Sequence, residues 1–574
     1  MIEAMRMATE PQVPPSAPLR PPSTVMRLSR LGASHQTRLS FMRALLRRLK
    51  SEHWEFDRPR WEISNDGVGT AVYRARGPKR SYSLVCFAHD LDPAQRTDRV
   101  IAEAWDATFA LYDGTPNVSE LARLKANVPL QEAGRFRASE LTLSRANRSV
   151  RLFEHVVASL AAGRQPDAEK LRAVGYLMRT TAVYGNGKFG IADRDRIADR
   201  PEFAGPFQAE MLTVWLIRAF TVDLAEHLAA ARARATAVRL DPAVRRTLGV
   251  GNATGLGLGP FIVNHPALFD CWISARETAL ARVRAVEAAT SETAAAFRDT
   301  LSRARALVAG WQVDDARQAA RIEDLDTDLK TLSAQVEAGA LDQPTPWDAL
   351  YRWGEDTLSL EGQEMLVGLL IEPHGALVDD LADAMAIDEA EVFRIDATQS
   401  VAALIEAIED LFGWALTIEF EAPAAQARFW YVSEEKLEPR LGERASEPGS
   451  ALEQPLTMAR DVAELHAVLQ DQDPDATLAE FLLGHPHHRR TVRRVQIAMR
   501  HPFSEIRDNL LADDMVPLDL LRCKLSFFGA TRFDPKSDRW LRINMYQYAP
   551  FPDELATDTT EDWAFPPLRR LVTA

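Results

Sequence analysis

A long apolar segment between Pro206 and Arg234 leaves this chain few ways to fold. Its hydrophobic residues recur at helical spacing and, in the first half, occupy almost every face of the helix. Such a helix has no polar face to expose to solvent, so we expect it to be buried at the centre of the molecule. Its most apolar stretch, 211–222, is shorter than the roughly 20 residues that a bilayer requires and contains Arg218. The sequence therefore predicts no membrane span.

Short β segments are predicted on both sides of this helix. Residues 60–64, 70–76 and 81–88 alternate with turn residues, which predicts an antiparallel meander. Two hairpins are expected nearer the C-terminus, one within 414–433 and one around the turn residues 534–538. The intervening sequence has helical periodicity. We therefore expect an α+β chain of several domains, mainly α-helical, with small antiparallel β elements and a large helical central domain.

Proline positions and changes in composition divide the chain into four parts. Residues 1–33 hold many prolines and no apolar periodicity, so we expect a flexible tail. Residues 34–116 are expected to form a small module of one helix and the meander. Residues 117–341 are expected to form the helical central domain. The sequence "GALDQPTP" separates it from a C-terminal α+β domain at 342–574.

Charge and cysteine content exclude several classes of protein. A formal net charge of −14 at pH 7 argues against nucleic acid as a general partner, because such a partner requires a positive face. The 3 cysteines lie far apart, so they predict neither a disulfide framework nor a cysteine zinc site. We expect a cytoplasmic protein without a metal site, and no motif identifies a cofactor.

A glycine-rich segment, "TLGVGNATGLGLGPFIVNHP" (247–266), ends where a helix is expected to begin at Pro266. It matches neither the dinucleotide fingerprint nor the Walker A loop, because other residues occupy the required glycine and lysine positions. Two explanations remain. The glycines permit close packing of the backbone, or the segment forms one wall of a pocket for a carboxylate or phosphate. In the second case the ligand-contacting residues are Asn252, Gly255, Gly257 and Asn264.

A second glycine-rich segment, "YGNGKFG" (184–190), favours the pocket. It places Asn186 and Lys188 in a glycine-flanked turn, shortly after Arg179. A lysine in such a turn can reach ligand oxygens that approach the backbone. The alternative is a helix end with a solvated lysine.

Arg218 and His265 add chemistry to this hypothesis. Arg218 has no carboxylate partner on the same face of its helix, and a buried guanidinium group requires a carboxylate or a bound anion. His265 stands directly before Pro266, where an imidazole can exchange protons with a substrate. We therefore hypothesise an enzyme that binds a small anionic substrate between the two glycine-rich segments and the helix carrying Arg218. His265 and Lys188 are the catalytic candidates, and the reaction is not identified.

The alternative hypothesis is a non-catalytic interaction or scaffold protein. Residues 290–338 hold two helices with an apolar 3,4 repeat, which predicts either a hairpin packed on the body or a contact between copies of the chain. The second possibility requires an exposed stripe, formed by Ile322, Leu325, Leu329 and Leu332. The basic tract "HPHHRRTVRR" (485–494) favours a solvated helix face, with phosphate, nucleic-acid or metal contact as weaker alternatives.

Overall fold

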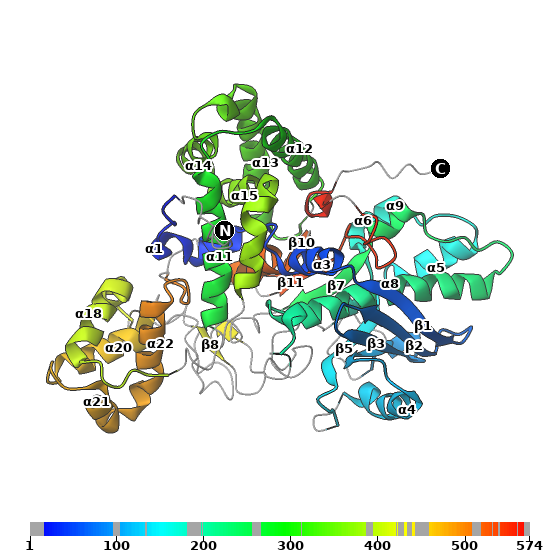
Figure 1. Cartoon of the computed structure of the whole chain (residues 1–574), viewed down its shortest axis with the longest axis horizontal. Coiled ribbons are helices and arrows are strands. Elements are labelled where there is room, and N and C mark those ends of the chain that lie inside the picture. The colour runs from blue at the N-terminus through cyan, green and yellow to red at the C-terminus, as the bar shows by residue number, and fades with distance from the viewer. Residues whose placement is uncertain are drawn as a thin grey trace, which may run out of the picture.

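The computed structural model describes most residues between 17 and 566. The residues outside this description are 1–16, 96–103, 132–134, 181–196, 198, 255–265, 312, 386–393, 421, 423–429, 433–438, 442–458, 508–517, 531, 538–539, 559–560 and 567–574. The α+β class is confirmed (Figure 1).

One large sheet joins strands from widely separated parts of the chain. Its order is β1-β2-β3-β4-β5-β6-β7-β11-β10, and every neighbouring pair is antiparallel except β6 and β7, which are parallel. The strands are β1 (Glu55–Ile63), β2 (Gly69–Arg76), β3 (Ser81–Ala88), β4 (Ala107–Asp113), β5 (Glu140–Arg148), β6 (Tyr176–Thr180), β7 (Gly249–Thr254), β10 (Arg532–Ser537) and β11 (Trp540–Met545). The meander of β1 to β3 and the hairpin of β10 and β11 agree with the sequence prediction.

Strands β5, β6 and β7 occur where the sequence indicates only helices. Their partners are distant in sequence, and local periodicity does not reveal such pairing. The sheet takes strands from 34–116, 117–341 and 342–574 alike. The expected boundaries at 116 and 341 therefore cut through one sheet and one continuous apolar core, and they do not separate domains.

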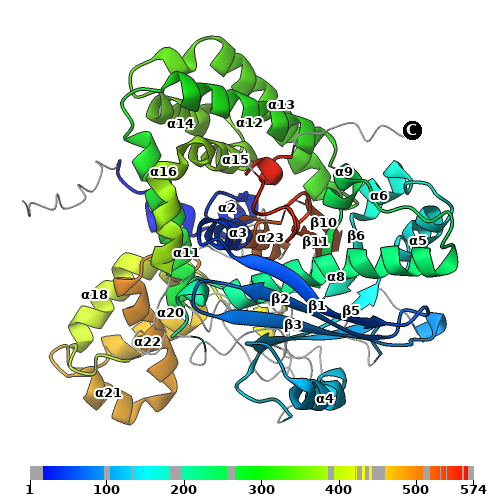
Figure 2. The ribbon, with the colours of Figure 1, turned by 45° about the vertical axis from the view of Figure 1, so that its right-hand side comes forward.

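The helix α8 (Gln208–Arg232) is central, as its apolar pattern predicts. Every residue from Gln208 to Val222 is buried. The helix lies across one face of the sheet, where Phe220 meets Phe109 of β4 edge-on with 5.5 Å between ring centroids. Helix α4 (Val118–Asn127) lies on the opposite face (Figure 2). No helix in the described ranges is long and apolar enough to cross a membrane.

The other helices surround this sheet or stand beside it. They are α1 (Pro22–Val25), α2 (Leu28–Ala33), α3 (Phe41–Ser51), α5 (Phe153–Ala161), α6 (Ala168–Val174), α9 (Pro242–Arg246), α11 (Pro266–Arg284), α12 (Ser291–Ala309), α13 (Ala316–Glu337), α14 (Pro346–Thr357), α15 (Leu360–Ile371), α16 (Gly375–Val378), α18 (Val401–Phe412), α20 (Ala459–Gln470), α21 (Leu478–Gly484), α22 (Arg489–Arg500) and α23 (Leu518–Phe528).

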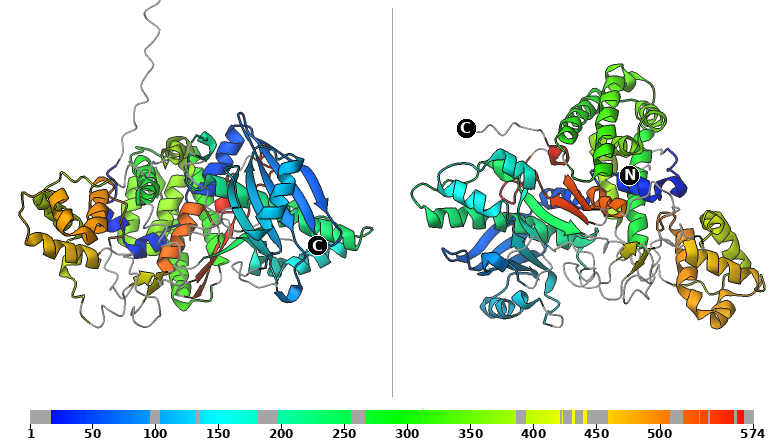
Figure 3. Two further views of the ribbon diagram at one scale, coloured as in Figure 1. Left: turned by 90° about the horizontal axis from the view of Figure 1, so that it is seen from below. Right: turned by 180° about the vertical axis from the view of Figure 1, so that it is seen from behind.

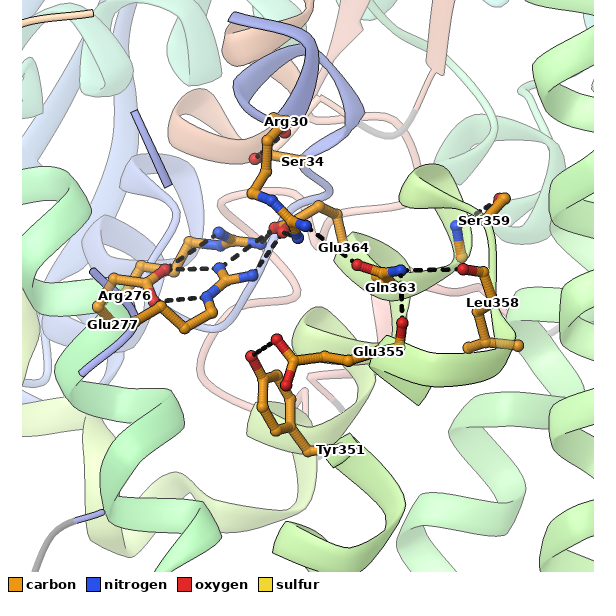
Figure 4. Close-up of polar contacts among 12 residues, drawn as sticks. Arg30, Ser34, Arg276, Glu277, Tyr351, Glu355, Leu358, Ser359, Gln363 and Glu364 are labelled. Carbon is orange, nitrogen blue, oxygen red and sulfur yellow. Dashed lines mark hydrogen bonds and ion pairs between the residues drawn. The ribbon is translucent and has the colours of Figure 1, made fainter. Parts of the chain in front are cut away.

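Residues 17–33 do not form the flexible tail that the prolines predict. Leu28 and Leu31 of α2 are buried. The buried Arg20 forms ion pairs with Glu277 of α11 at 2.7 Å and with Glu364 of α15 at 2.6 Å. Figure 4 shows the same cluster, in which Glu364 also accepts a hydrogen bond from Arg30 of α2. Composition identified a segment without a core of its own, but it did not reveal the buried carboxylates on distant helices that hold this segment.

The helices of 290–338 form a hairpin packed within the chain. Leu325, Leu329 and Leu332 of α13 are at most 1% exposed, and α13 packs on α12 and α15. Ile322 is also buried. The exposed stripe required for a contact between copies is therefore absent from α13, because the body of the same chain covers it.

Helices α18, α20, α21 and α22 form a small helical unit with its own apolar core. Figure 3 shows this unit at the end of the molecule opposite the large sheet. Strand β8 (Trp430–Val432) pairs with β9 (Pro439–Leu441). The expected hairpin within 414–433 is wrong, because Ala415–Thr417 forms a 3-10 helix instead of a strand.

Candidate functional site

Six residues that the sequence assigns to the site lie outside the described part of the chain. They are Asn186, Lys188, Gly255, Gly257, Asn264 and His265. The structure places the other three, with Arg179 in β6, Arg218 in α8 and Asn252 in β7.

The two glycine-rich segments follow neighbouring strands. Strand β6 ends at Thr180, and the parallel strand β7 ends at Thr254. Parallel neighbours end at the same edge of a sheet, so the segments 181–196 and 255–265 begin at one edge. This topology brings the starting points of both segments together, as the hypothesis requires.

Arg179 and Asn252 lie on adjacent strands but on opposite faces of the sheet. Arg179 is level with Gly251, so the next residue, Asn252, faces the other side. A Cβ atom at Gly251 would lie 2.7 Å from Cγ of Arg179, which explains the glycine by close packing. Likewise, a Cβ atom at Gly249 would lie 2.6 Å from the carbonyl oxygen of Met545. The first half of 247–266 is thus a packed strand and not a ligand-binding loop.

Backbone carbonyl groups satisfy the guanidinium group of Arg218. It donates from Nε to Leu248 at 2.6 Å, from Nη1 to Ala549 at 2.8 Å and from Nη2 to Arg246 at 3.2 Å. Its Cζ lies 3.8 Å from the ring centroid of Phe551. The inference that Arg218 requires a carboxylate or an anion is therefore wrong, because carbonyl oxygens and an aromatic face take the same donors.

The position of Arg218 also separates it from the glycine-rich segments. Leu248, which accepts its hydrogen bond, precedes β7, whereas residues 255–265 follow the other end of that strand. Six strand residues span roughly 20 Å. Arg218 therefore lies near the end of β7 opposite the edge at which both glycine-rich segments begin.

A different cleft holds the polar groups best placed for chemistry. It has a volume of about 520 Å³ and lies between β1 and β2, the second half of α8, the segment 237–239 and residues 552–553. This volume suits a small organic molecule. Its polar lining residues are Asp57, Arg58, Tyr73, Arg74, Asp223, Glu226, His227, Arg239, Arg245 and Asp553.

One carboxylate oxygen of Asp223 accepts two hydrogen bonds. Oδ2 accepts hydrogen bonds from Arg58 at 2.7 Å and from the Tyr73 hydroxyl at 2.5 Å. Burial and then Asp223 raise the pKa of Tyr73 well above its usual value, so the phenol stays protonated and donates. Within the described residues, no hydrogen bond to Oδ1 of Asp223 is present, which leaves an acceptor for a ligand.

Glu226 lies one helical turn after Asp223 and lines the same cleft. Its Oε1 accepts a hydrogen bond from the backbone N–H of Leu240 at 3.1 Å, and its Oε2 lies 3.9 Å from Arg239. Burial, together with the charge of Asp223, raises the pKa of Glu226 above its ordinary value. Glu226 is therefore the carboxyl group in the cleft best suited to carry a proton.

His227 stabilises the cleft and is not free for catalysis. Its Nδ1 accepts from the indole N–H of Trp61 at 3.3 Å, and its Nε2 lies 2.9 Å from the carbonyl oxygen of Ser64, which fixes Nε2 as the donor. Both nitrogens of the imidazole are thus occupied. Arg58 lies over the Trp61 ring at 4.5 Å, and the side chain of Arg239 is 90% exposed at the rim. These two arginines supply positive charge at the mouth of the cleft.

A larger groove of about 980 Å³ runs beside α3, but its cations are already paired. Arg47 lies 3.4 Å from Glu561, Arg48 pairs with Asp383, and Lys50 donates to a backbone carbonyl. These carboxylates neutralise arginines on the basic face of α3. The groove therefore has few polar groups available to a ligand.

The sequence contains a signal for the cleft that the glycine-rich hypothesis does not use. Asp223, Glu226 and His227 stand at spacings of three and four residues in the second half of an otherwise apolar helix. Comparisons of this chain with protein-family models, with curated proteins and with solved structures found no match.

Proposed function

We propose that the protein is a cytoplasmic enzyme that transfers a proton to or from a small anionic substrate in the cleft beside α8. The observation that carries this proposal is the pair of carboxyl groups, Asp223 and Glu226, one turn apart on α8 and in different environments. Two carboxyl groups treated differently by their surroundings can act as base and acid in one site.

The arrangement assigns a role to each group. The open oxygen of Asp223 accepts a hydrogen bond from a substrate hydroxyl or amine. Glu226, when it carries a proton, donates to a substrate oxygen. Arg58 and Arg239 attract a carboxylate or phosphate to the mouth of the cleft. The favoured substrate is therefore a small acid that also carries hydroxyl or amino groups.

A cytoplasmic setting is consistent with the thiols. Cys86, Cys271 and Cys523, all in the described part of the chain, form no disulfide, as in a reducing compartment. The scaffold alternative loses its main support, because the apolar face of α13 is buried inside the chain.

A screen of small ligands tests the proposal and identifies the substrate at the same time. Small hydroxy acids, amino acids and sugar phosphates are scored by the thermal stability of the wild-type chain, and each hit is followed by NMR for chemical conversion. We expect at least one hit whose binding is weakened about tenfold by Arg58→Gln, and whose conversion is lost in Glu226→Gln while binding remains. Asp342→Asn, at a site remote from the cleft lining, serves as the matched control. Conversion at the wild-type rate by Glu226→Gln would refute the proposal.

A further inference from the structure

The start of helix α22 gathers positive charge at one end of the helical unit. The sequence "HPHHRRTVRR" becomes a 3-10 turn, Pro486–His488, that leads directly into α22. Arg489, Arg490, Arg493 and Arg494 all fall within the first two turns of that helix. A helix N-terminus is itself positive, so four arginines there repel both the helix dipole and one another.

Within the described part of the chain, one of these arginines has a bidentate carboxylate partner. Arg494 forms a bidentate pair with Glu505, with both contacts at 2.6 Å. Arg489 and Arg490 have no ion pair with any described residue. Burial, and then repulsion from Arg494, lowers the pKa of Arg490. The charges of Asp461 and Glu505 offset only part of this effect, so the pKa of Arg490 stays below its usual value.

His488 provides a second, independent sign of a ligand at the same place. It is the N-cap residue of α22 and is 7% exposed, yet no side chain caps the helix. Its Nε2 has no hydrogen-bond partner among the described residues. A buried imidazole nitrogen without a partner is costly unless something binds it. His487 lies against the same ring at 4.1 Å between centroids.

We propose that the start of α22 binds a phosphate group, held by Arg489, Arg490 and His488. Arginine presents donors that match phosphate oxygens, and a helix N-terminus favours the same ligand. This site is separate from the cleft beside α8, and its proposal does not depend on the proposed enzyme function.

Beyond its first turns, most of α22 is covered by described residues, up to the exposed Met499 and Arg500. Further along the helix, Gln496 donates to the backbone of Asp396 at 2.9 Å and to Gln399 at 2.6 Å, so 396–399 covers it. A helix covered in this way cannot lie lengthwise in a DNA groove to read bases. Contact is therefore with phosphate, either in a small phosphorylated molecule or in a nucleic-acid backbone.

Calorimetric titration of the full chain with tripolyphosphate at low ionic strength tests the site. We expect saturable binding that weakens at least tenfold in the double variant Arg489→Ser/Arg490→Ser and that weakens steeply as salt is added. The matched control is Arg460→Ser/Arg500→Ser, which removes the same charge from the same helical unit and should bind as wild type does. Thermal melts confirm that both variants are folded.

A second titration, with a labelled single-stranded oligonucleotide, distinguishes the two phosphate sources. Tighter binding of the oligonucleotide than of tripolyphosphate, lost in the same double variant, supports the site with a nucleic-acid backbone as ligand. Binding of tripolyphosphate alone supports the site with a small phosphorylated ligand. Absence of any binding, or equal weakening by the two double variants, overturns the proposal.

Discussion

At the scale of single residues, Arg218 demonstrates how a buried guanidinium is satisfied without an anion. Its donors meet carbonyl groups from two separate segments, 246–248 and 549–550, and thereby fasten the C-terminal region to α8. A lone cation in an apolar helix thus indicates a structural tie as readily as it indicates a ligand.

Arg218→Met keeps most of the volume but leaves these buried carbonyl groups without donors. We expect the free energy of unfolding to fall by about 2–4 kcal/mol, since each stranded buried acceptor costs roughly 1–3 kcal/mol and the removed charge returns part of that. Urea denaturation measures the change. Arg239→Met, at a side chain 90% exposed, should change stability by less than about 0.5 kcal/mol. An Arg218→Met protein as stable as wild type would show that the carbonyl contacts are dispensable.

Glu226 makes stability depend on pH in a defined direction. Burial raises its folded pKa above the ordinary value of 4.5, so the folded state holds the proton more tightly than the unfolded state does. Its contribution to stability is therefore complete below the unfolded pKa and is lost as pH rises through the folded pKa. Relative to Glu226→Gln, the wild type should gain stability as pH falls from neutral toward the ordinary value of 4.5.

The matched comparison is Glu140→Gln. Burial opposes ionisation of Glu140, but hydrogen bonds led by Arg123 prevail and lower its pKa. The stability difference between wild type and Glu140→Gln should stay nearly constant over the same pH range. It should shrink only as pH falls below the unfolded pKa toward the folded one. Parallel pH profiles for the two glutamine variants would contradict the assignment of Glu226.

At the scale of secondary-structure elements, the sequence predicted those elements that depend on local periodicity and turn residues. Apolar periodicity located α8 and the α12–α13 hairpin, and turn residues located the meander. The sequence did not predict strand β7, because three of its first five residues are Gly249, Gly251 and Asn252, which have low strand propensity. It is a strand because β6 and β11 pair with it, and Arg179 and Met545 leave no room for a Cβ atom at its two glycines.

Leu329→Asp tests whether the hairpin serves internal packing. Leu329 is 1% exposed, so an unpaired carboxylate there should cost a few kcal/mol and lower the melting temperature by many degrees. The mass from light scattering should be unchanged, because the seam is within one chain. Thr331→Asp, on the exposed side of α13, is the control and should melt as wild type does. A Leu329→Asp variant that melts normally but loses oligomer mass would restore the contact between copies.

At the scale of the whole molecule, long-range contacts decide both the boundaries and the site. The N-terminal segment is held by Glu277 and Glu364, more than two hundred residues away in sequence. The cleft joins α8 to strands β1 and β2 and to residues near 552. The ion pairs of the N-terminal segment leave no local trace, and the cleft leaves only the spacing of Asp223, Glu226 and His227. The sequence therefore predicted the fold class and the central helix but not the domain boundaries. Of the predicted site residues, the described part of the chain places Arg179, Arg218 and Asn252, and Arg179 and Asn252 lie on opposite faces of the sheet.

Arg20→Met measures how firmly the N-terminal segment is attached. It leaves Glu277 and Glu364 buried with one cation fewer, and breaking a buried ion pair typically costs about 3–5 kcal/mol. We expect a lower melting temperature and faster proteolysis within 17–33. Arg172→Met, whose pair with Glu169 is solvent-exposed, should have little effect. If both variants melt alike, the segment is only loosely attached.

The proposed enzyme depends above all on where its substrate binds, and a crystal structure of the chain with the best ligand from the screen shows this location. We predict density in the cleft beside α8, with an acidic group of the ligand near Arg58 and Arg239 and a hydroxyl or amine within hydrogen-bonding distance of Asp223 and Glu226. Density at the carboxyl ends of β6 and β7, with the cleft empty, would refute the cleft as the active site and return the site to the glycine-rich segments.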